Sequence, residues 1–300
     1  MAVKMPSASV VVMTHNRAGV LQKTLDAMLK QDYAANYEIV VVNDGSTDKT
    51  REMLAREFGG EKRIKVLNQK RSFPCRARNN GIKNARNNFV VIMDDDCIPA
   101  RNWLGNLMIG FFENGALNKK IGVVSSFHEF GGTSTAFKRE ALTKVGGYDE
   151  NYRYYREDTD LVFRILDAGY ENRVVKNAKF RHEHKMENPQ GLSGWIRYGL
   201  ERCGYHMNDV LLYKNNPARA EKFLDVKMGF LVNPFADWAT ATNQWGKGGE
   251  LRLGSPRGLT FVQNKSPMHA LAIIGAAWGY VLCVKAYRLS GSIKFGKLLV

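Results

Sequence analysis

The sequence predicts an α/β fold in which helices cover both faces of a mostly parallel sheet. Through the first hundred residues, apolar strand-like runs alternate with segments whose apolar residues repeat at helical spacing. Polar clusters follow directly after three of these runs. The chain has 300 residues, 44% of them hydrophobic, which is enough for one large domain or a domain with an extension. This composition excludes a disordered or fibrous protein.

Four strands and the helices between the first three can be placed from the pattern alone. The apolar runs fall at residues 10–13, 38–42, 64–67 and 89–93. Leucine and methionine recur at helical spacing between the first two runs, and another short helical repeat separates the second and third. A βαβ succession implies parallel strands, and such sheets bind ligands beyond the carboxyl ends of their strands.

The three polar tips are therefore expected to converge on one crevice. Residues 14–17 (Thr-His-Asn-Arg) follow the first strand, residues 43–46 (Asn-Asp-Gly-Ser) the second, and residues 94–96 (Asp-Asp-Asp) the fourth. Hard divalent cations prefer carboxylate oxygens and share them with substrate phosphates, so the aspartates predict a metal site, with a solvated acidic turn as the alternative. Asp44 either accepts a hydrogen bond from a nucleoside or belongs to a helix-capping turn.

Charge and cysteine content narrow the class of protein. The formal net charge of +15 favours an anionic partner such as a nucleotide, a nucleic acid or a lipid phosphate, without choosing among them. The four cysteines form no Cys-x-x-Cys pair, so neither a disulfide framework nor a zinc knuckle is indicated. We expect a cytoplasmic protein, because the start of the sequence shows no signal-peptide pattern.

A second acidic cluster lies near the middle of the chain. Residues 157–160 (Glu-Asp-Thr-Asp) are predicted to form the first turn of a helix that ends near Gly169. The helix dipole favours ionised carboxylates there, and an ionised carboxylate can take a proton from an attacking hydroxyl. The alternative is that these residues only stabilise the helix start.

Four blocks of sequence, in this order and spacing, resemble the family 2 glycosyltransferases, which have the GT-A fold. The resemblance covers roughly residues 8–184. The matching blocks are VVVMTHNRAGVLQKTLDAML, IVVVNDGSTDKT, RARNNGIKNARNNFVVIMDDDCIP and GGTSTAFKREALTKVGGYDENYRYYREDTDLVFRILDAGY.

The resemblance implies a nucleotide-sugar donor, with a UDP-sugar as the first expectation, and inversion at the anomeric carbon in a single displacement. It also implies Mn²⁺ or Mg²⁺ as cofactor, held by an Asp-x-Asp motif. Asp94 and Asp96 would meet the ribose and the metal, with the division of labour left open by Asp95 between them. The expected donor-binding residues are Thr14, Asn16, Arg17, Asp44, Arg78, Asp94 and Asp95.

The same resemblance assigns the acceptor side of the site. Asp158 would be the catalytic base and Glu157 would position the acceptor, although these two roles could be exchanged. Gly132 and Thr133 lie in a region that borders the acceptor and the donor sugar in the family. His182 is expected as a third metal ligand, chosen narrowly over His184.

The resemblance fades after residue 185, so we expect a catalytic domain at 1–185 and a mainly helical extension at 186–300. An apolar run at 270–284 falls short of the ~20 residues needed to span a bilayer. It predicts either a helix at the cytoplasmic face of a membrane or one buried in the domain. The Gln-x-x-Arg-Trp motif and multiple spans of polysaccharide synthases in this family are missing from the sequence. Transfer of one sugar to a glycan or lipid-linked acceptor is therefore expected.

Two other classes of protein would share some of these features. A nucleic-acid-binding protein would explain the charge, but acidic strand tips would repel a phosphate backbone, and no nucleic acid is expected as partner. A non-catalytic sugar- or lipid-binding relative would keep the fold and lose the acids. The presence of Asp94, Asp96 and Asp158 argues against it.

Overall fold

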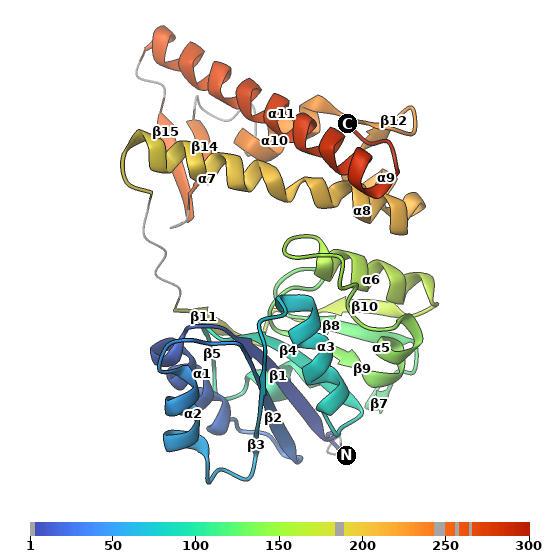
Figure 1. Cartoon of the computed structure of the whole chain (residues 1–300). Helices are drawn as coiled ribbons and strands as arrows, with labels where there is room; N and C mark the ends of the chain where they lie inside the picture. The colour runs from blue at the N-terminus through green and yellow to red at the C-terminus, as the bar shows by residue number, and fades with distance from the viewer. Residues whose placement is uncertain (1–3, 184–188, 243–249, 256–257, 264–265) are drawn as a thin grey trace. The chain divides into compact units, whose positions relative to one another are not determined.

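The computed structural model describes residues 4–183, 189–242, 250–255, 258–263 and 266–300. The chain divides into two compact units, Met1–His184 and Lys185–Val300 (Figure 1). Each unit is described by itself.

The N-terminal unit is built on a seven-stranded sheet with the order β10-β8-β9-β4-β1-β2-β3. Neighbouring strands are parallel except for β9, which runs antiparallel to both β4 and β8. The predicted mostly parallel sheet is confirmed, and each of the four predicted strands is present. The strands are β1 (Ala8–Thr14), β2 (Tyr37–Asp44), β3 (Ile64–Gln69), β4 (Phe89–Asp94), β8 (Ile121–Ser125), β9 (Thr135–Lys138) and β10 (Glu171–Val174).

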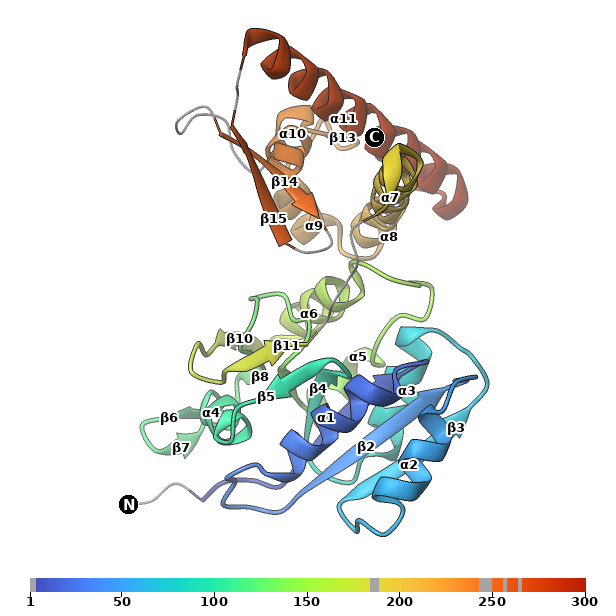
Figure 2. The ribbon, with the colours of Figure 1, turned by 90° about the vertical axis from the view of Figure 1, so that its left-hand side faces the viewer.

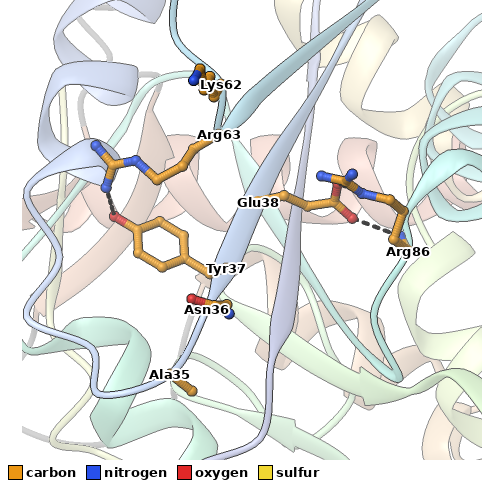
Figure 3. A pocket seen from close by; sticks show the side chains of 7 residues that line it. All are labelled: Ala35, Asn36, Tyr37, Glu38, Lys62, Arg63 and Arg86. Carbon is orange, nitrogen blue, oxygen red and sulfur yellow. Dashed lines mark hydrogen bonds and ion pairs between the residues drawn. The ribbon is translucent and has the colours of Figure 1, made fainter.

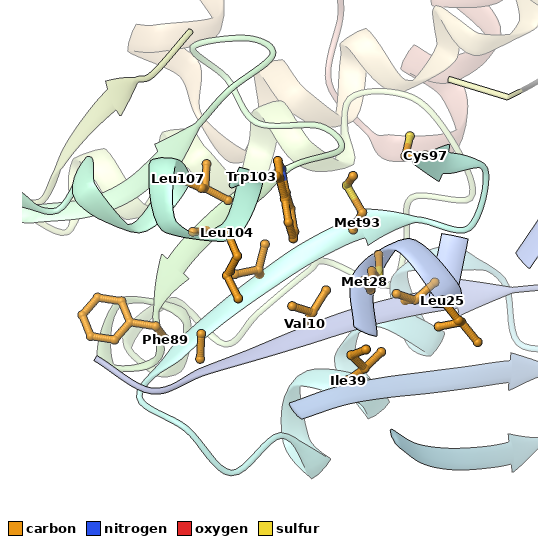
Figure 4. Packing of buried hydrophobic residues seen from close by; sticks show 14 of the residues in the cluster. Val10, Leu25, Met28, Ile39, Phe89, Met93, Cys97, Trp103, Leu104 and Leu107 are labelled. Atoms are coloured by element: carbon orange, nitrogen blue, oxygen red, sulfur yellow. The ribbon is translucent and has the colours of Figure 1, made fainter. Parts of the chain in front are cut away.

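Helices cover both faces of this sheet because its central strands are apolar on both sides. Val10 and Val12 pack with α1 and α2 in one core cluster, which also contains Trp103 from α4 (Figure 4). The alternate residue Val11 faces α3, on the other side of the sheet. The helices are α1 (Ala18–Leu29), α2 (Thr50–Phe58), α3 (Pro74–Asn84), α4 (Trp103–Ile109), α5 (Arg139–Val145) and α6 (Glu157–Asp167).

Two short strands extend the fold beyond the carboxyl end of β4. β5 (Cys97–Pro99) pairs antiparallel with β11 (Phe180–His182), and this register places His182 opposite Cys97. A further small hairpin joins β6 (Phe112–Glu113) to β7 (Ala116–Leu117). The β5–β11 pair therefore brings the end of the N-terminal unit back to its aspartate triplet.

The C-terminal unit is mainly helical, as the sequence predicts, and also contains two hairpins. Its helices are α7 (Gly191–Tyr205), α8 (Met207–Asn215), α9 (Pro217–Leu224), α10 (Pro234–Thr242) and α11 (Pro267–Phe295). Its hairpins are β12 (Val226–Lys227) with β13 (Leu231–Val232), and β14 (Glu250–Ser255) with β15 (Gly258–Gln263). The apolar run 270–284 forms part of the 29-residue helix α11. A search of the described residues finds no helix with the length and apolarity needed to cross a membrane.

A buried ionic cluster lies at the centre of the C-terminal unit. The guanidinium of Arg288, on α11, donates to Asp209 on α8 and to Asp237 on α10, with N···O distances of 2.7 to 3.0 Å. His206 Nδ1 lies 2.8 Å from the same carboxylate oxygen of Asp209. All four side chains are buried. One side chain of α11 thus joins two other helices of the unit.

Candidate active site

The polar tips of the first, second and fourth strands meet, which confirms the prediction that they converge. The Thr14 hydroxyl donates to Asp95 Oδ2 at 2.6 Å, and Arg17 Nη1 lies 2.7 Å from Asp96 Oδ2. Asn16 joins the first tip to the second, because its Oδ1 accepts a 2.7 Å hydrogen bond from the backbone N–H of Thr47. The site is therefore held together by side chains that stand at the carboxyl ends of parallel strands.

Asp44 is fully buried and organises the loop that follows β3. Its two carboxylate oxygens accept hydrogen bonds from Gln69, Arg71, Ser72 and the backbone N–H of Phe73, at 2.8 to 3.0 Å. The neighbouring Gly45 has φ +69°, and a Cβ there would lie 2.6 Å from the backbone nitrogen of Arg71. Glycine is thus the residue that lets the two segments approach so closely.

Two carboxylates and an imidazole form a set of candidate metal ligands beside these tips. Ligand atoms of Asp94, Asp96, Cys97 and His182 all lie within 4.8 Å of one another. His182 Nε2 is 3.5 Å from Asp96 Oδ1. Carboxylate oxygen and imidazole nitrogen suit Mn²⁺ and Mg²⁺, whereas burial raises the pKa of the Cys97 thiol and keeps it protonated. His184, the other histidine considered, lies outside the described residues.

Arg78 links the aspartate triplet to the acidic start of α6. Its guanidinium lies 3.5 Å from Asp94, 3.1 Å from Glu157 and 3.9 Å from Asp158. The side chain is almost completely buried, so these charges interact in a medium of lower polarity than water. One buried cation therefore contacts carboxylates from β4 and from α6, which places both acidic clusters around the same guanidinium.

Asp158 stands in the first turn of α6, as predicted, and its surroundings alter its proton affinity. Burial raises the pKa of Asp158 to about 7, with Glu157 and Asp94 acting in the same direction. Arg78 and the Tyr148 hydroxyl, which donates to Asp158 Oδ1 at 3.0 Å, act against this rise. Gly131, at φ +90°, packs against the Cβ of Asp158. A carboxylate with a pKa near neutrality is well matched to proton transfer.

The other acids of the site differ in how fully they are paired. Glu157 Oε1 accepts from Arg78, whereas the buried Oε2 has no hydrogen-bond partner among the described residues. Burial raises the pKa of Asp95 to about 6, against the lowering effects of Thr14 and Arg17. An unpaired buried carboxylate oxygen is costly, and Glu157 Oε2 is the unsatisfied polar atom at the start of α6 among the described residues.

The glycine-rich segment before β9 contacts the aspartate triplet at residues 94–96. The Thr133 hydroxyl is buried and accepts a 3.0 Å hydrogen bond from the backbone N–H of Asp94. Gly132, at φ +95°, precedes it in the left-handed region. The structure thus places both residues at the site, where Thr133 touches Asp94 rather than presenting its hydroxyl to solvent.

A cavity of about 480 Å³ lies at the opposite ends of the strands (Figure 3). It is lined in part by Tyr37 and Glu38, at the start of β2, and by Arg86. Glu38 is already neutralised there by Arg86 and bonded to the Ser9 hydroxyl. This cavity contains none of the predicted site residues, and it lies away from the strand ends where such sheets bind ligands.

Sequence reasoning assigned no role to Tyr148, which the structure places in the site. Arg71, one of three arginines around α3 that the sequence offers as phosphate ligands, donates in the structure to Asp44. Tyr148 donates to Asp158, but in the sequence it reads only as part of a Gly-Gly turn. Its contact depends on how α3, α5 and α6 pack, which a linear pattern does not report.

The pH dependence of catalysis tests the Tyr148–Asp158 contact. We expect kcat/KM to fall as the pH drops below about 7, because a protonated Asp158 cannot accept a proton. Tyr148→Phe removes a donor that favours the ionised form, so this fall should move to higher pH by roughly half a unit or more. A pH profile of kcat/KM measures the shift, and Tyr152→Phe is the matched control, since Tyr152 bonds Asp160 instead. A profile that Tyr148→Phe leaves in place would contradict this assignment.

The chain is similar in sequence to known glycosyltransferases. The family model described as "Glycosyl transferase family 2" matches residues 9–166. The chain is 25% identical over 236 residues to chondroitin synthase of Escherichia coli, covering 58% of this chain and 34% of that protein. It is 35% identical over 170 residues to the glycosyltransferase GlyA of Streptococcus pneumoniae, covering 56% of this chain and 20% of that protein. The chain thus spans about a third or less of the length of these relatives.

Solved structures show the same fold. The mannosyltransferase PcManGT from Pyrobaculum calidifontis, in complex with GDP-Man and Mn²⁺, superposes with a TM-score of 0.62 at 21% identity, over 95% of this chain and 88% of that one. GalNAc-T7 with UDP, GalNAc and Mn²⁺ gives a TM-score of 0.54 at 17% identity, over 61% of this chain and 45% of that one. The fold is GT-A-like, and the chain belongs to glycosyl transferase family 2, whose members are nucleotide-sugar glycosyltransferases.

Proposed function

We propose that this protein is an inverting, metal-dependent glycosyltransferase that moves one sugar from a nucleoside diphosphate donor to a hydroxyl of a glycan or a lipid-linked acceptor. A UDP-sugar is the first donor to test. The observation that carries the proposal is the position of Arg78, which contacts Asp94 on one side and Asp158 on the other. A candidate metal ligand and a candidate base therefore lie around one guanidinium.

The donor side of the pocket is assigned to the strand tips. Asp94, Asp96 and His182 would hold Mn²⁺ or Mg²⁺, and the ion would neutralise charge that develops on the leaving diphosphate. Arg17 adds a fixed positive group beside Asp96, and such groups stabilise a developing anion. Asp44 supports the nucleoside side by holding the loop of residues 69–73, with Thr14 and Asn16 fixing the neighbouring tips.

The acceptor side is assigned to the start of α6. Asp158 takes the proton of the acceptor hydroxyl while that oxygen forms its bond to the anomeric carbon. The bond from that carbon to the diphosphate oxygen breaks in the same step, and its electron pair leaves with the diphosphate. Glu157 positions the acceptor, and Arg78 keeps both carboxylates in place.

Donor turnover tests this function. The protein is incubated with a panel of nucleotide sugars and Mn²⁺, and slow release of the diphosphate from one donor, absent with chelator, is the expected result. The best donor is then offered to lipid and glycan extracts, and the product is identified by mass spectrometry. Tight binding of oligonucleotides with no turnover of any donor would overturn the proposal.

The metal assignment gives a separate prediction. Asp96→Ala should weaken both Mn²⁺ binding and donor binding, by about tenfold or more, because it removes a charged ligand oxygen. Electron paramagnetic resonance of Mn²⁺ titrated into the protein measures the first effect, and calorimetry with UDP and GDP the second. Glu52→Ala, which removes an exposed carboxylate from α2, is the control and should change neither. Mn²⁺ affinity equal to that of the unmodified protein would exclude Asp96 as a ligand.

A further inference from the structure

Helix α11 buries a charged side chain together with Ala277, Val281 and Val284, and it carries further apolar side chains on its outer face. Arg288 is 2% exposed and is bonded to Asp209 and Asp237. On the other side, Leu282 is 66% and Ile293 82% exposed. The outer face of a helix that is exposed to water is normally polar. The outward face of α11 is therefore suited to an apolar environment.

The exposed residues form one continuous line, which we call the outer stripe. At 3.6 residues per turn they fall within roughly 80° of one another and extend over roughly 33 Å of helix. The outer stripe consists of Leu271, Gly275, Trp278, Leu282, Ala286, Leu289 and Ile293, all exposed. It contains no charged side chain and no polar one. An uninterrupted apolar line of this length on a surface marks an interaction site.

Among the described residues, α10 contacts the outer stripe at Trp278, whereas Leu271, Leu282, Leu289 and Ile293 are exposed. α7, α8 and α10 all lie on the same side of α11, which runs along an edge of this unit in both views (Figures 1 and 2). Trp278 also belongs to an aromatic group, with its ring centroid 6.3 Å from Phe235 and 5.1 Å from Trp238. Together with Ala239 these rings line an apolar cavity of about 410 Å³. Phe235 is 69% and Trp278 38% exposed, whereas Trp238 is buried. Exposed aromatic rings are typical of the water–lipid boundary.

The net charge of the C-terminal unit indicates which kind of partner covers the outer stripe. Residues 185–300 contain fifteen Lys and Arg against seven Asp and Glu. Two of the seven acids, Asp209 and Asp237, are buried against Arg288, which leaves the surface more positive still. A second copy of this chain would bring the same positive charge and would be repelled. A surface of anionic lipid headgroups would be attracted, by about 1 kcal/mol for each nearby Lys or Arg.

We propose that the outer stripe of α11 docks on the surface of an anionic lipid bilayer, with the helix parallel to the membrane plane. In this position the apolar side chains of the stripe enter the boundary between headgroups and acyl chains. The basic side chains of the unit remain in the headgroup layer. The inference rests on the C-terminal unit alone and does not depend on which donor or acceptor the enzyme uses.

Vesicle binding by the full chain tests this docking. We expect co-flotation with vesicles of phosphatidylcholine and phosphatidylglycerol, much weaker binding to vesicles of phosphatidylcholine alone, and a loss of binding in high salt, where charges are screened. If the protein binds neither kind of vesicle, the proposal is overturned. Binding to both with no effect of salt or lipid charge would overturn its electrostatic part.

Substitutions in the outer stripe separate docking from simple charge attraction. The pair Leu282→Gln and Leu289→Gln leaves the net charge unchanged and should lower the vesicle partition coefficient at least about tenfold, because two apolar side chains no longer enter the boundary. Ile109→Gln, which changes an exposed apolar residue on α4, is the matched control and should bind as the unmodified protein does. Equal binding by the paired variant and the control would overturn the role of the stripe.

Two measurements keep the proposal testable if the paired variant misfolds. Phosphatidylcholine–phosphatidylglycerol vesicles with bromine-labelled acyl chains should quench the tryptophan fluorescence of the unmodified protein, and Trp278→Phe should reduce that quenching. Analytical ultracentrifugation tests the alternative that a second copy of the chain covers the outer stripe. A dimer that dissociates on substitution of Leu282 would show that a second copy covers the stripe and would overturn membrane docking.

Discussion

Replacing Asp158 with Asn is expected to abolish sugar transfer while leaving donor binding intact. Asn has nearly the same shape but cannot accept the acceptor proton, and loss of a positioned base costs about 10²- to 10⁴-fold in rate. The donor-side residues Asp94 and Asp96 are unchanged, so calorimetric binding of the donor with Mn²⁺ should persist. Steady-state kcat and KM, measured with the donor and acceptor identified by turnover, separate the two effects.

The stability of the Asp158→Asn variant provides its control. The pKa of Asp158, about 7, lies above the ~4 of an unfolded aspartate, so the folded chain binds more protons between about pH 4 and 7. Ionisation of Asp158 therefore lowers stability as the pH rises through this window, and the neutral Asn should unfold at the same or a higher temperature at pH 8. Asp167→Asn, at the exposed other end of α6, should transfer sugar normally. Normal transfer by Asp158→Asn would place the base elsewhere.

Replacing Arg288 with Met is expected to unfold the C-terminal unit or to leave it marginally stable. The substitution leaves the carboxylates of Asp209 and Asp237 buried without the guanidinium that bonds them. Removing one partner of such a buried ionic group costs about 3–5 kcal/mol. Urea unfolding and hydrogen exchange across residues 189–300 measure the loss.

Two further variants define what the Arg288 result means. Lys294→Met removes an exposed charge from the same helix and should leave the urea midpoint almost unchanged. Adding Asp209→Asn and Asp237→Asn to Arg288→Met should restore part of the stability, because the two buried carboxylate charges are then removed. A midpoint for Arg288→Met equal to that of Lys294→Met would show that the cluster contributes nothing to folding.

The sheet, its strand tips and the start of α6 could be predicted because each is encoded locally. Four apolar runs bounded by polar residues give β1 to β4, and the rule that parallel strands bind ligands at their carboxyl ends brings Thr14, Asp44 and Asp94 to one edge. Residues 157–160 start a helix because an acidic first turn precedes an apolar helical face. The orientation of β9, antiparallel to its neighbours, has no comparable local signal.

The pairings within the site could not be predicted because they join segments far apart in sequence. Nothing near Arg17 shows that it will pair with Asp96, and nothing near Tyr148 shows that its hydroxyl will reach Asp158. His182 reaches the triplet only through the register of β11 against β5. Packing of whole elements decides these contacts.

The C-terminal unit shows a different limit of linear patterns. The run 270–284 is readable as apolar, and Arg288 as a charge beyond its end. Hydropathy alone predicts that such a charge faces water. In the structure two carboxylates from other helices turn it inward, and the apolar residues of the outer stripe face outward.

The contacts that build the pocket also fix when it can exist during synthesis. Thr14 is bonded to a residue 81 positions later, and Arg17 and Arg78 to residues 79 positions later. Translation adds residues in order, and the pocket is completed only by β11, close to the end of the N-terminal unit. Ordering at such long separations is slow. A ribosome-bound nascent chain that ends before β11 thus lacks His182 and the β5–β11 pair, although its strand tips are already synthesised.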